Sequence, residues 1–396
     1  MISQQSLAWG RSKSCIRELA AYGTARRAEI GADKVFDFSI GNPSLPPPPC
    51  VEQALLDILR DSPAVEVHGY TAAPGLAALR QAIAEDRNRC WGCALEGRHI
   101  YVCCGAAAGL IACTRGLLNP GEQAIAFAPF FPEYRVFTES AGAELVTVPP
   151  RENLQPDLEA FAAALTEKTG LVILNSPNNP SGVILSGESL EAISSLLRSA
   201  QERYGHPIYL LSDEPYRELV YDNSPVPCVF DFYDNSIVCY SFSKSMSLPG
   251  ERIGYLAVSP RMQEGQQVFD ALAGAARGCG YVNPPSLMQR LLLRCLGQTS
   301  DISAYKRNRD LLCGGLRELG FSCVEPQGAF YLFLKCPIPD AKAFSEAAKK
   351  YELLLVPSDD FGLGGYVRLA YCVSEQTIRN AMPAFRKLAE EFGLYK

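Results

Sequence analysis

The sequence has few histidines, no basic stripe and no long apolar run. Its three histidines, His68, His99 and His206, are far apart in 396 residues. No run approaches the roughly 18 apolar residues that a membrane-spanning helix needs, and the polar start of the chain lacks the apolar core of a secretory signal peptide. The formal net charge is -6, whereas nucleic-acid-binding domains are usually basic. These absences predict a cytoplasmic protein without a membrane or nucleic-acid partner.

Cysteine is abundant, but its pattern does not indicate a metal site. The chain has 15 cysteines, an odd number, scattered along its length. Cys90 and Cys93 have the C-x-x-C spacing of many metal and redox sites, and Cys103 and Cys104 follow further on. A zinc or iron–sulfur site would need a second well-spaced pair or nearby histidines. We therefore predict no metal, and interpret most cysteines as small buried apolar residues of a reduced, intracellular protein.

Length and composition predict a globular protein with two domains. The chain is longer than one hydrophobic core usually supports, and its 47% hydrophobic and 20% charged residues are ordinary for a globular protein. Strands are predicted at 171–174, 208–211 and 237–240, with a helix over about 190–203 between the first two. This alternation predicts a parallel α/β sheet with right-handed crossovers.

The C-terminal part predicts a smaller α+β domain. A long helix rich in Leu and Arg is predicted over 286–319. A strand at 329–334, a helix at 341–351, a strand at 367–371 and an amphipathic helix from about Glu375 follow. We predict a large domain at 47–285 and a small domain that combines the N-terminal arm, 1–46, with 286–396. The stiff proline run at 46–49 is predicted to connect the arm to the large domain.

Polar residues follow three of the predicted strands at the point where each strand ends. Asn175 follows the first, Asp213 comes two residues after the second, and the run 241–244, which ends in Lys244, follows the third. Ligands bind outside the carboxyl ends of strands in parallel α/β sheets. We therefore expect an amide, a carboxylate and an amine at one rim. Taken singly, each has a structural explanation as a turn residue, a helix cap or a solvated lysine.

The motifs around these residues resemble those of the class I and II aminotransferases, which are pyridoxal 5'-phosphate (PLP) enzymes of fold type I. The resemblance is clearest in Ser-Phe-Ser-Lys at 241–244, followed by Leu-Pro-Gly-Glu-Arg-Ile-Gly at 248–254. It implies an α/β fold with a mainly parallel seven-stranded sheet in the large domain. The resemblance extends over nearly the whole chain and includes Gly41-Asn42-Pro43, Tyr70 with Gly75 and Leu79-Arg80, Gly105-Ala106-Ala107, Pro129-Phe130-Phe131-Pro132, 175–182, 212–216 and Arg368.

The resemblance implies roles for the residues around the cofactor ring. Lys244 is expected to carry PLP as a Schiff base and then to move protons. Asp213 is expected to pair with the pyridine nitrogen, and its charge keeps that nitrogen protonated. Tyr216 and Asn179 are expected to bind the phenolic oxygen of PLP. Phe131 is expected to stack on the ring, although it could instead be an ordinary core aromatic.

The phosphate group is expected at the start of a helix. Gly105, Ala106 and Ala107 follow a strand predicted at 100–103 and precede a helix predicted over 108–118. Small residues let a phosphate approach the backbone, and the first turn of a helix has free N–H groups.

Hydroxyl groups and a cation are expected to complete the phosphate site. Ser241 and Ser243 supply hydroxyls, and Arg252 supplies a bidentate cation. In the family, a tyrosine of the partner subunit also reaches the phosphate, and Tyr70 matches it. The resemblance therefore implies a homodimer with shared active sites.

Arg368 lies in an apolar predicted strand, where an unpaired charge is costly. The resemblance implies that it binds the α-carboxylate of the substrate bidentately, assisted by the main-chain N–H of Gly41 and the side chain of Asn179. An intramolecular ion pair is the structural alternative for this arginine.

The identity of the substrate is left open. Some dicarboxylate-using members of the family carry a lysine in the stretch that here is Gly105 to Ala108, so an aspartate-specific enzyme is less favoured. Arg17, Arg26 and Arg277 are alternative partners for a distal carboxylate. We expect an aminotransferase that moves an amino group from an L-amino acid to a 2-oxo acid, with 2-oxoglutarate as the expected acceptor.

Two other functions are alternatives to this expectation. The first is β-elimination at a C–S bond on the same scaffold, because PLP supplies the chemistry and the pocket selects the bond. The second is a ligand-sensing regulator, which would need a basic DNA-binding segment before the module. Only 40 residues precede Gly41, so this second alternative is disfavoured.

Overall fold

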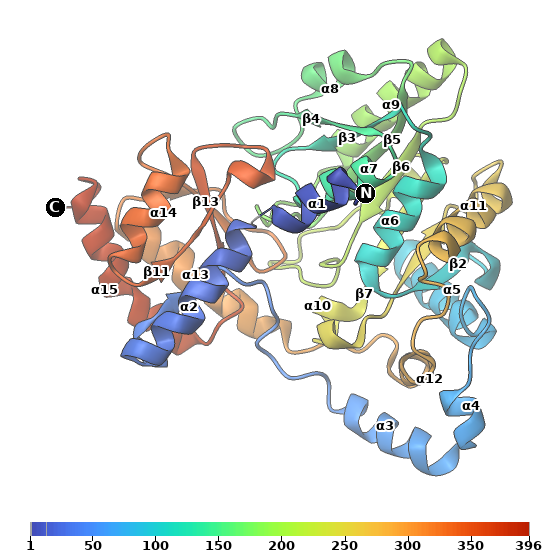
Figure 1. Ribbon diagram of the computed structural model, residues 1–396, viewed down its shortest axis with the longest axis horizontal. Coiled ribbons are helices and arrows are strands. Elements are labelled where there is room, and N and C mark those ends of the chain that lie inside the picture. The colour runs from blue at the N-terminus through green and yellow to red at the C-terminus, as the bar shows by residue number, and fades with distance from the viewer. Residues whose placement is uncertain (1, 13, 396) are drawn as a thin grey trace.

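The computed structural model describes residues 2–12 and 14–395, and its centre is a seven-stranded sheet (Figure 1). The strand order is β2-β8-β7-β6-β5-β3-β4. Strands β3 to β7 are paired in parallel, whereas β8 is antiparallel to both of its neighbours. The predicted mainly parallel seven-stranded sheet is confirmed. Its strands are β2 (Ile100–Cys103), β3 (Gln123–Phe127), β4 (Glu144–Val148), β5 (Thr169–Asn175), β6 (Tyr209–Asp213), β7 (Ser236–Ser241) and β8 (Gly254–Val258).

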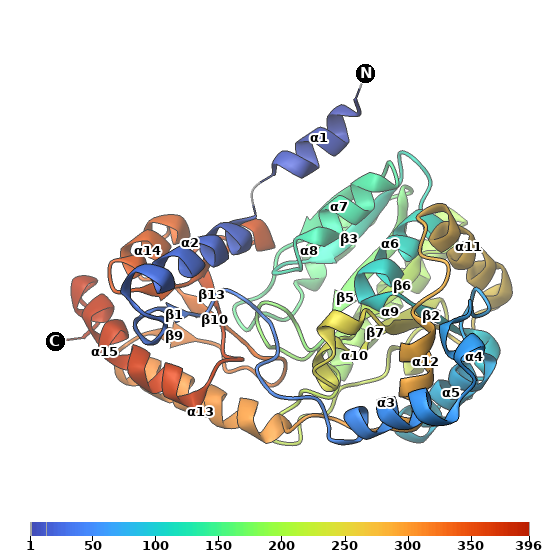
Figure 2. The same cartoon turned by 60° about the horizontal axis from the view of Figure 1, so that its bottom comes forward.

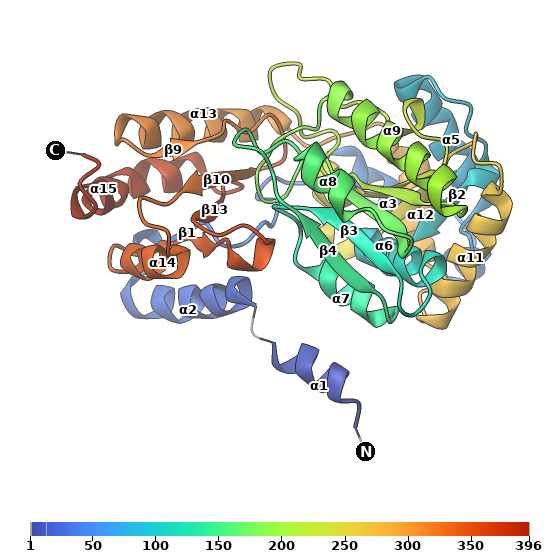
Figure 3. The same ribbon diagram turned by 90° about the horizontal axis from the view of Figure 1, so that it is seen from above.

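Helices cover both faces of this sheet, so its central strands are buried throughout. In β5, Leu171 and Ile173 belong to a hydrophobic cluster with α6, α7 and α11, whereas Val172 and Leu174 belong to a cluster with α8 and α9. Figure 3 shows these two groups of helices on opposite sides of the strands. The helices are α3 (Cys50–Asp61), α4 (Ala64–His68), α5 (Ala77–Trp91), α6 (Gly105–Leu117), α7 (Glu133–Ser140), α8 (Leu158–Ala164), α9 (Gly187–Tyr204), α10 (Phe242–Ser245), α11 (Gly265–Gly278) and α12 (Ser286–Cys295).

The C-terminal part forms a separate sheet with its own hydrophobic cluster. Four strands in the order β12-β13-β10-β9 pair antiparallel, and β1 pairs in parallel with β11. Apolar side chains of α13, α14 and α15 pack on this sheet. The elements are β9 (Ser322–Cys323), β10 (Tyr331–Lys335), β11 (Leu353–Leu354), β12 (Val356–Pro357), β13 (Tyr366–Ala370), α13 (Ile302–Glu318), α14 (Ala341–Lys349) and α15 (Glu375–Glu391).

The N-terminal arm packs on this C-terminal sheet. Leu19 of α2 (Cys15–Ile30) and Val35, just before β1 (Phe36–Asp37), share a small cluster with Leu354, Val356 and Phe361. In Figures 2 and 3, α2 lies along α14, while the short helix α1 (Gln4–Arg11) projects away from it. The division of the chain into domains at 47–285 and at 1–46 with 286–396 remains a prediction.

The long helix expected over 286–319 is wrong, because the chain breaks between α12 and α13. Gly297 has a φ of +80° there, a left-handed conformation that ends the helical path. Helix α12 packs on α3 and α5, whereas α13 packs on α15. The expected strand at 329–334 begins later, at Tyr331, because Ala329 has a φ of +57°.

The described residues contain neither a membrane-spanning helix nor a metal-binding cluster. Every helix in 2–12 and 14–395 is too short or too polar to cross a lipid bilayer. The same residues contain no cluster of three or more His, Cys, Asp or Glu side chains that could hold a metal ion.

Candidate active site

Three adjacent strands, β5, β6 and β7, bring polar residues to one edge of the large sheet. Asn175 lies opposite Asp213 in the register of β5 and β6. The Asn175 side chain donates to the Asp213 carbonyl at 2.8 Å and accepts from the Asn179 main chain at 2.7 Å. The turn after β5 is therefore fixed to the end of β6. Lys244 lies in α10, the short helix that directly follows β7.

A cavity of about 310 Å³ opens beside these strand ends. Besides the residues expected from the sequence, Ile16, Leu110 and Tyr331 contribute to its wall. The expected residues that line it are Gly41, Ala106, Ala107, Phe131, Asn179, Asp213, Tyr216, Ser241, Ser243, Lys244, Arg252 and Arg368.

Two of the expected residues do not line this cavity. Gly105 lies just behind it with a φ of +77°, and a Cβ atom there would come within 2.8 Å of Arg252 Nη2. Glycine is therefore required where α6 begins. Tyr70 lies away from the cavity with 98% of its surface exposed.

Lys244 lines the cavity and is held by the loop that contains Gly41. Its Nζ donates to the Gly41 carbonyl at 2.9 Å and lies 5.5 Å from the centre of the Phe330 ring. Burial, with the nearby Arg252 and Arg368, lowers the pKa of Lys244 to about 8. A substantial fraction of this amine is therefore neutral, and nucleophilic, near physiological pH.

Asp213 is buried with only half of its carboxylate satisfied. Its Oδ2 accepts from the Tyr134 hydroxyl at 2.5 Å. Its Oδ1 has no hydrogen-bond partner among the described residues. Burial raises the pKa of Asp213 to about 7, although the Tyr134 hydrogen bond lowers it in part. The ionised carboxylate is therefore short of one donor and of one positive charge.

Arg368 in β13 is buried beside Tyr216 and Tyr331. Its guanidinium donates to Asn179 Oδ1 at 3.2 Å and to the Ser39 carbonyl at 2.5 Å, and stacks 4.7 Å from the centre of the Tyr331 ring. Its Nε has no partner among the described residues. The intramolecular ion pair considered as an alternative is not present among the ion pairs of the described residues. Arg368 therefore keeps donors for an anion.

Hydroxyls and an arginine also line the cavity, beside the first turn of α6. Ser241 Oγ lies 2.7 Å from Ser243 Oγ and accepts from the Ser243 main chain at 3.2 Å. Arg252 has a φ of +49° and donates to the Pro249 carbonyl at 2.9 Å. Donors from three separate segments thus meet where Ala106 and Ala107 begin the helix.

These residues fit PLP, the cofactor implied by the sequence. The protonated ring nitrogen of PLP would supply the donor and the positive charge that Asp213 Oδ1 lacks. The hydroxyls, Arg252 and the start of α6 suit a phosphate dianion. Two of the buried polar atoms without partners among the described residues belong to lining residues of this cavity, Asp213 Oδ1 and Arg368 Nε, and a bound cofactor and a bound carboxylate would supply their partners.

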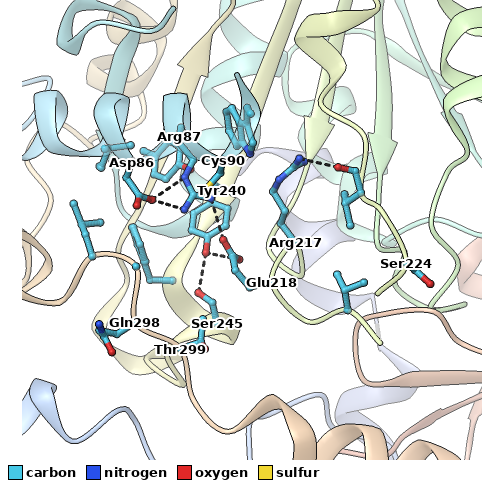
Figure 4. Close-up of a pocket in the computed structure, with 18 residues that line it drawn as sticks. Asp86, Arg87, Cys90, Arg217, Glu218, Ser224, Tyr240, Ser245, Gln298 and Thr299 are labelled. Carbon is cyan, nitrogen blue, oxygen red and sulfur yellow. Dashed lines mark hydrogen bonds and ion pairs between the residues drawn. The ribbon is translucent and has the colours of Figure 1, made fainter. Parts of the chain in front are cut away.

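A second cavity, of about 450 Å³, lies between α5 and the segments that follow β6 and β7 (Figure 4). Its ionised side chains are paired with neighbouring residues. Arg87 bonds Asp86 and Glu218, and Arg217 bonds Glu214. Tyr240 donates to Glu218 at 2.6 Å. Because these charges are already compensated, we do not interpret this cavity as the reactive site. Its paired side chains instead support the segment that carries Lys244.

Two site residues were not identified from the sequence. Tyr134 lies in the first turn of α7, close after the Pro-Phe-Phe-Pro motif, and Tyr331 lies in β10, which was predicted as a strand with no role in the site. The Tyr134 hydroxyl hydrogen-bonds Asp213, and the Tyr331 hydroxyl hydrogen-bonds Tyr216. The available signal was weak. A buried tyrosine needs a hydrogen-bond partner, but the sequence does not show which one.

Comparisons with known proteins identify the family of the chain. The model of the aminotransferase class I and II family matches residues 33–385. The aspartate/prephenate aminotransferase of Thermus thermophilus is 31% identical over 331 residues, covering 81% of this chain and 83% of that protein. An aminotransferase structure from Eubacterium rectale is 45% identical, has a TM-score of 0.97 and covers 99% of both chains. The aspartate aminotransferase of Thermus thermophilus with maleate is 27% identical, with a TM-score of 0.87 over 98% of this chain and 99% of that one.

The raised pKa of Asp213 predicts that the cofactor-free protein loses folding stability as pH rises. The folded chain retains a proton up to about pH 7 that the unfolded chain loses near pH 4, so stability should fall as pH rises through this window. Asp213→Asn removes this titration. We expect the variant to be more stable than the parent at pH 8 by about 2–4 kcal/mol, and the gap to shrink as pH falls toward 4.

Chemical unfolding of the cofactor-free proteins between pH 5 and pH 8 measures this gap. Glu202→Gln, at an exposed carboxylate, is the matched control and should show no such trend. A gap between Asp213→Asn and the parent that stays constant with pH would contradict the burial argument.

Proposed function

The chain belongs to the aminotransferase class I and II family, and we propose that the cavity around Lys244 is its active site. The protein is a PLP-dependent enzyme that transfers amino groups between amino acids and 2-oxo acids. The observation that carries the assignment of the site is the buried, half-satisfied carboxylate of Asp213. It lies in the same cavity as an amine of lowered pKa, Lys244, and a buried arginine with a free donor, Arg368.

The residues around the ring would hold the cofactor in one orientation. PLP, when bound, supplies a ring that accepts the electron pair left at the substrate α-carbon. Asp213 keeps the ring nitrogen protonated, and Tyr134 orients that carboxylate. Tyr216 and Asn179 donate to the phenolic oxygen, and Phe131 covers one face of the ring.

The phosphate would be held at the start of α6. The main-chain N–H groups from Gly105 to Ala107 lie in the first turn of α6, at the positive end of the helix dipole. Ser241 and Ser243 donate hydroxyls, and Arg252 adds a charge-assisted bond.

The substrate would be held by its carboxylate while Lys244 moves the proton. Arg368 binds the α-carboxylate, assisted by Asn179 and by the main-chain N–H of Gly41. A Cβ atom at Gly41 would come within 1.9 Å of the Tyr331 hydroxyl, so only glycine fits there. The neutral Nζ of Lys244 would take the proton from the substrate α-carbon and hold it for the later proton transfer.

Two half-reactions test this function. When the PLP-loaded protein is mixed with a single L-amino acid, we expect the cofactor absorbance to shift to that of its amino form. A 2-oxo acid, with 2-oxoglutarate as the acceptor we propose, should restore the original spectrum. Lys244→Ala should slow the shift by about 10²–10⁴-fold, the usual contribution of a positioned acid–base group.

Lys335→Ala, at an exposed lysine of β10, is the matched control and should convert at the normal rate. A panel of twenty amino acids in the same assay identifies the donor. Release of pyruvate and ammonia from a C–S substrate, without the spectral shift, would instead support β-elimination.

We further propose that the protein is a homodimer in which Tyr70 reaches the phosphate of the partner's active site. Tyr70 is 98% exposed and lies outside the cavity of its own chain. Leu56, Leu59 and Val65 are more than half exposed on α3 and α4, which project from the body of the molecule in Figure 1. Exposed apolar side chains of this kind are typical of a subunit interface.

Mixed dimers test whether Tyr70 acts between subunits. Tyr70→Phe should weaken PLP binding by about 10-fold or more, the cost of a hydrogen bond to a charged group. At a PLP concentration too low to fill this variant, its homodimer should be inactive, as should the Lys244→Ala homodimer. Co-expression of the two variants should restore activity at about a quarter of the sites, because only a mixed dimer of two-fold symmetry contains one intact site.

The reference for this test is a co-expression of Lys244→Ala with Tyr281→Phe, another exposed tyrosine, which should show the activity of the intact lysine alone. If the Tyr70→Phe mixture stays inactive although mixed dimers form, Tyr70 does not act in the partner's site.

We propose Arg17 as the partner for the distal carboxylate of 2-oxoglutarate. Of the three arginines considered, Arg26 is tied to Glu352 and Glu29. Arg277 lies in the last turn of α11, away from the cavity. Arg17 is exposed and follows Ile16, which lines the cavity.

Replacement of Arg17 separates two acceptors of different charge. Arg17→Gln should raise the KM for 2-oxoglutarate by about 10-fold, because a charge-assisted hydrogen bond is lost. The KM for pyruvate, which has no second carboxylate, should not change. Arg277→Gln is the control and should leave both values unaltered. An equal effect of Arg17→Gln on both acceptors would exclude this role.

A further inference from the structure

Tyr331 contacts three parts of the site that have separate tasks. It is the first residue of β10, pairs with Ala370 of β13 and is 3% exposed. Its hydroxyl lies 3.1 Å from the Tyr216 hydroxyl. Its ring lies 4.7 Å from the Arg368 guanidinium. Its hydroxyl also packs on the Gly41 backbone, which accepts from Lys244.

The direction of the bond between the two tyrosines follows from their protons. Burial raises the pKa of Tyr331 to about 12, and burial beside Tyr331 raises the pKa of Tyr216 well above its usual value. Both hydroxyls therefore keep their protons at neutral pH. A phenol has one hydrogen to donate. If Tyr216 donates it to the ring oxygen of PLP, the bond between the tyrosines must be donated by Tyr331.

Such a chain of donors makes the terminal donor stronger. A hydroxyl that accepts a hydrogen bond is polarised and donates better, particularly where the local dielectric is low. Tyr331 is the hydrogen-bond partner that the structure gives to the buried Tyr216 hydroxyl. The strength of the bond from Tyr216 to the cofactor should therefore depend on Tyr331.

We propose that Tyr331 is a positioning residue that acts through Tyr216 on the cofactor oxygen and through its ring on Arg368. The inference rests on the proposed function, because it takes Tyr216 as the donor to PLP. The two effects come from different atoms of Tyr331. The hydroxyl tunes the ring oxygen, whereas the ring face holds the guanidinium that binds the carboxylate by a cation–π contact.

Tyr331→Phe removes the hydroxyl and keeps the ring. A hydrogen bond donated to the ring oxygen of PLP stabilises the negative charge on that oxygen, so the oxygen holds a neighbouring proton less strongly. A weaker donor therefore raises the pH midpoint at which the absorbance of the bound cofactor changes. We expect the midpoint of the loaded protein to rise by about 0.5–1 pH unit, and kcat to fall by about 3–10-fold, as for one lost hydrogen bond. The substrate KM should stay within about twofold, because the ring still supports Arg368.

Tyr331→Leu removes the ring as well and should raise the substrate KM by about 10-fold in addition. Comparison of the pH midpoint and the substrate KM between the two variants separates the effect of the Tyr331 hydroxyl from that of its ring. If Tyr331→Phe raises KM as much as Tyr331→Leu and leaves the midpoint unchanged, the inference is overturned.

The double variant Tyr216→Phe/Tyr331→Phe is the decisive measurement. If Tyr331 acts through Tyr216, its removal should shift the midpoint no further once Tyr216 has lost its hydroxyl. Additive shifts would overturn the inference. Tyr305→Phe, at a buried tyrosine of the same core outside the cavity, is the control and should not move the midpoint.

The single variant Tyr216→Phe separates failure of the inference from failure of the proposed function. A midpoint that rises in Tyr216→Phe and not in Tyr331→Phe rejects the role of Tyr331 alone. A midpoint unchanged in both variants rejects Tyr216 as the donor to the cofactor, and the inference with it.

Discussion

The site depends on a buried carboxylate whose charge is not fully compensated by the folded chain. Asp213 ends the central strand β6, with neighbours on both sides, so its position is fixed by the whole sheet. Tyr134 satisfies one of its oxygens, and the other has no partner in the described part of the chain. Burial of a charge without a partner is costly. A ligand with a protonated ring nitrogen would remove this cost, and the other residues of the cavity surround that point.

Much of this arrangement follows from the order of the sequence. Asn175, Asp213 and Lys244 each come just after a buried strand, and adjacent parallel strands must end at the same edge. Local patterns are sufficient for this conclusion, because strand periodicity and strand ends are properties of short segments. The motif resemblance then connected these ends with Gly41 and Arg368, which are distant in the sequence and which line the same cavity.

The features that were missed depend on contacts between distant segments. The break at Gly297 follows from a left-handed backbone conformation, and the surrounding Leu- and Arg-rich sequence favours helix on both sides. Tyr134 and Tyr331 were not expected in the site, because the partner of a buried hydroxyl is decided by tertiary packing. Tyr70 raises the opposite problem. Its side chain is exposed in the single chain, whereas the expected contact with the cofactor phosphate would form only in a dimer.

The position of Lys244 depends on both sides of the large sheet. Lys244 lines the cavity of the proposed active site. The next residue, Ser245, lines the second cavity, where its Oγ lies 2.8 Å from the Tyr240 hydroxyl. Tyr240 in turn bonds Glu218, which is paired with Arg87 of α5. Glu218 lies two residues after Tyr216, so these partly buried contacts link the segment after β6 to α5 and to α10 (Figure 4). They hold α10, and with it Lys244, relative to the end of β6. The cavity around Lys244 therefore exposes unpaired polar groups to ligands. The second cavity contains paired charges that hold the ligand-binding residues in place.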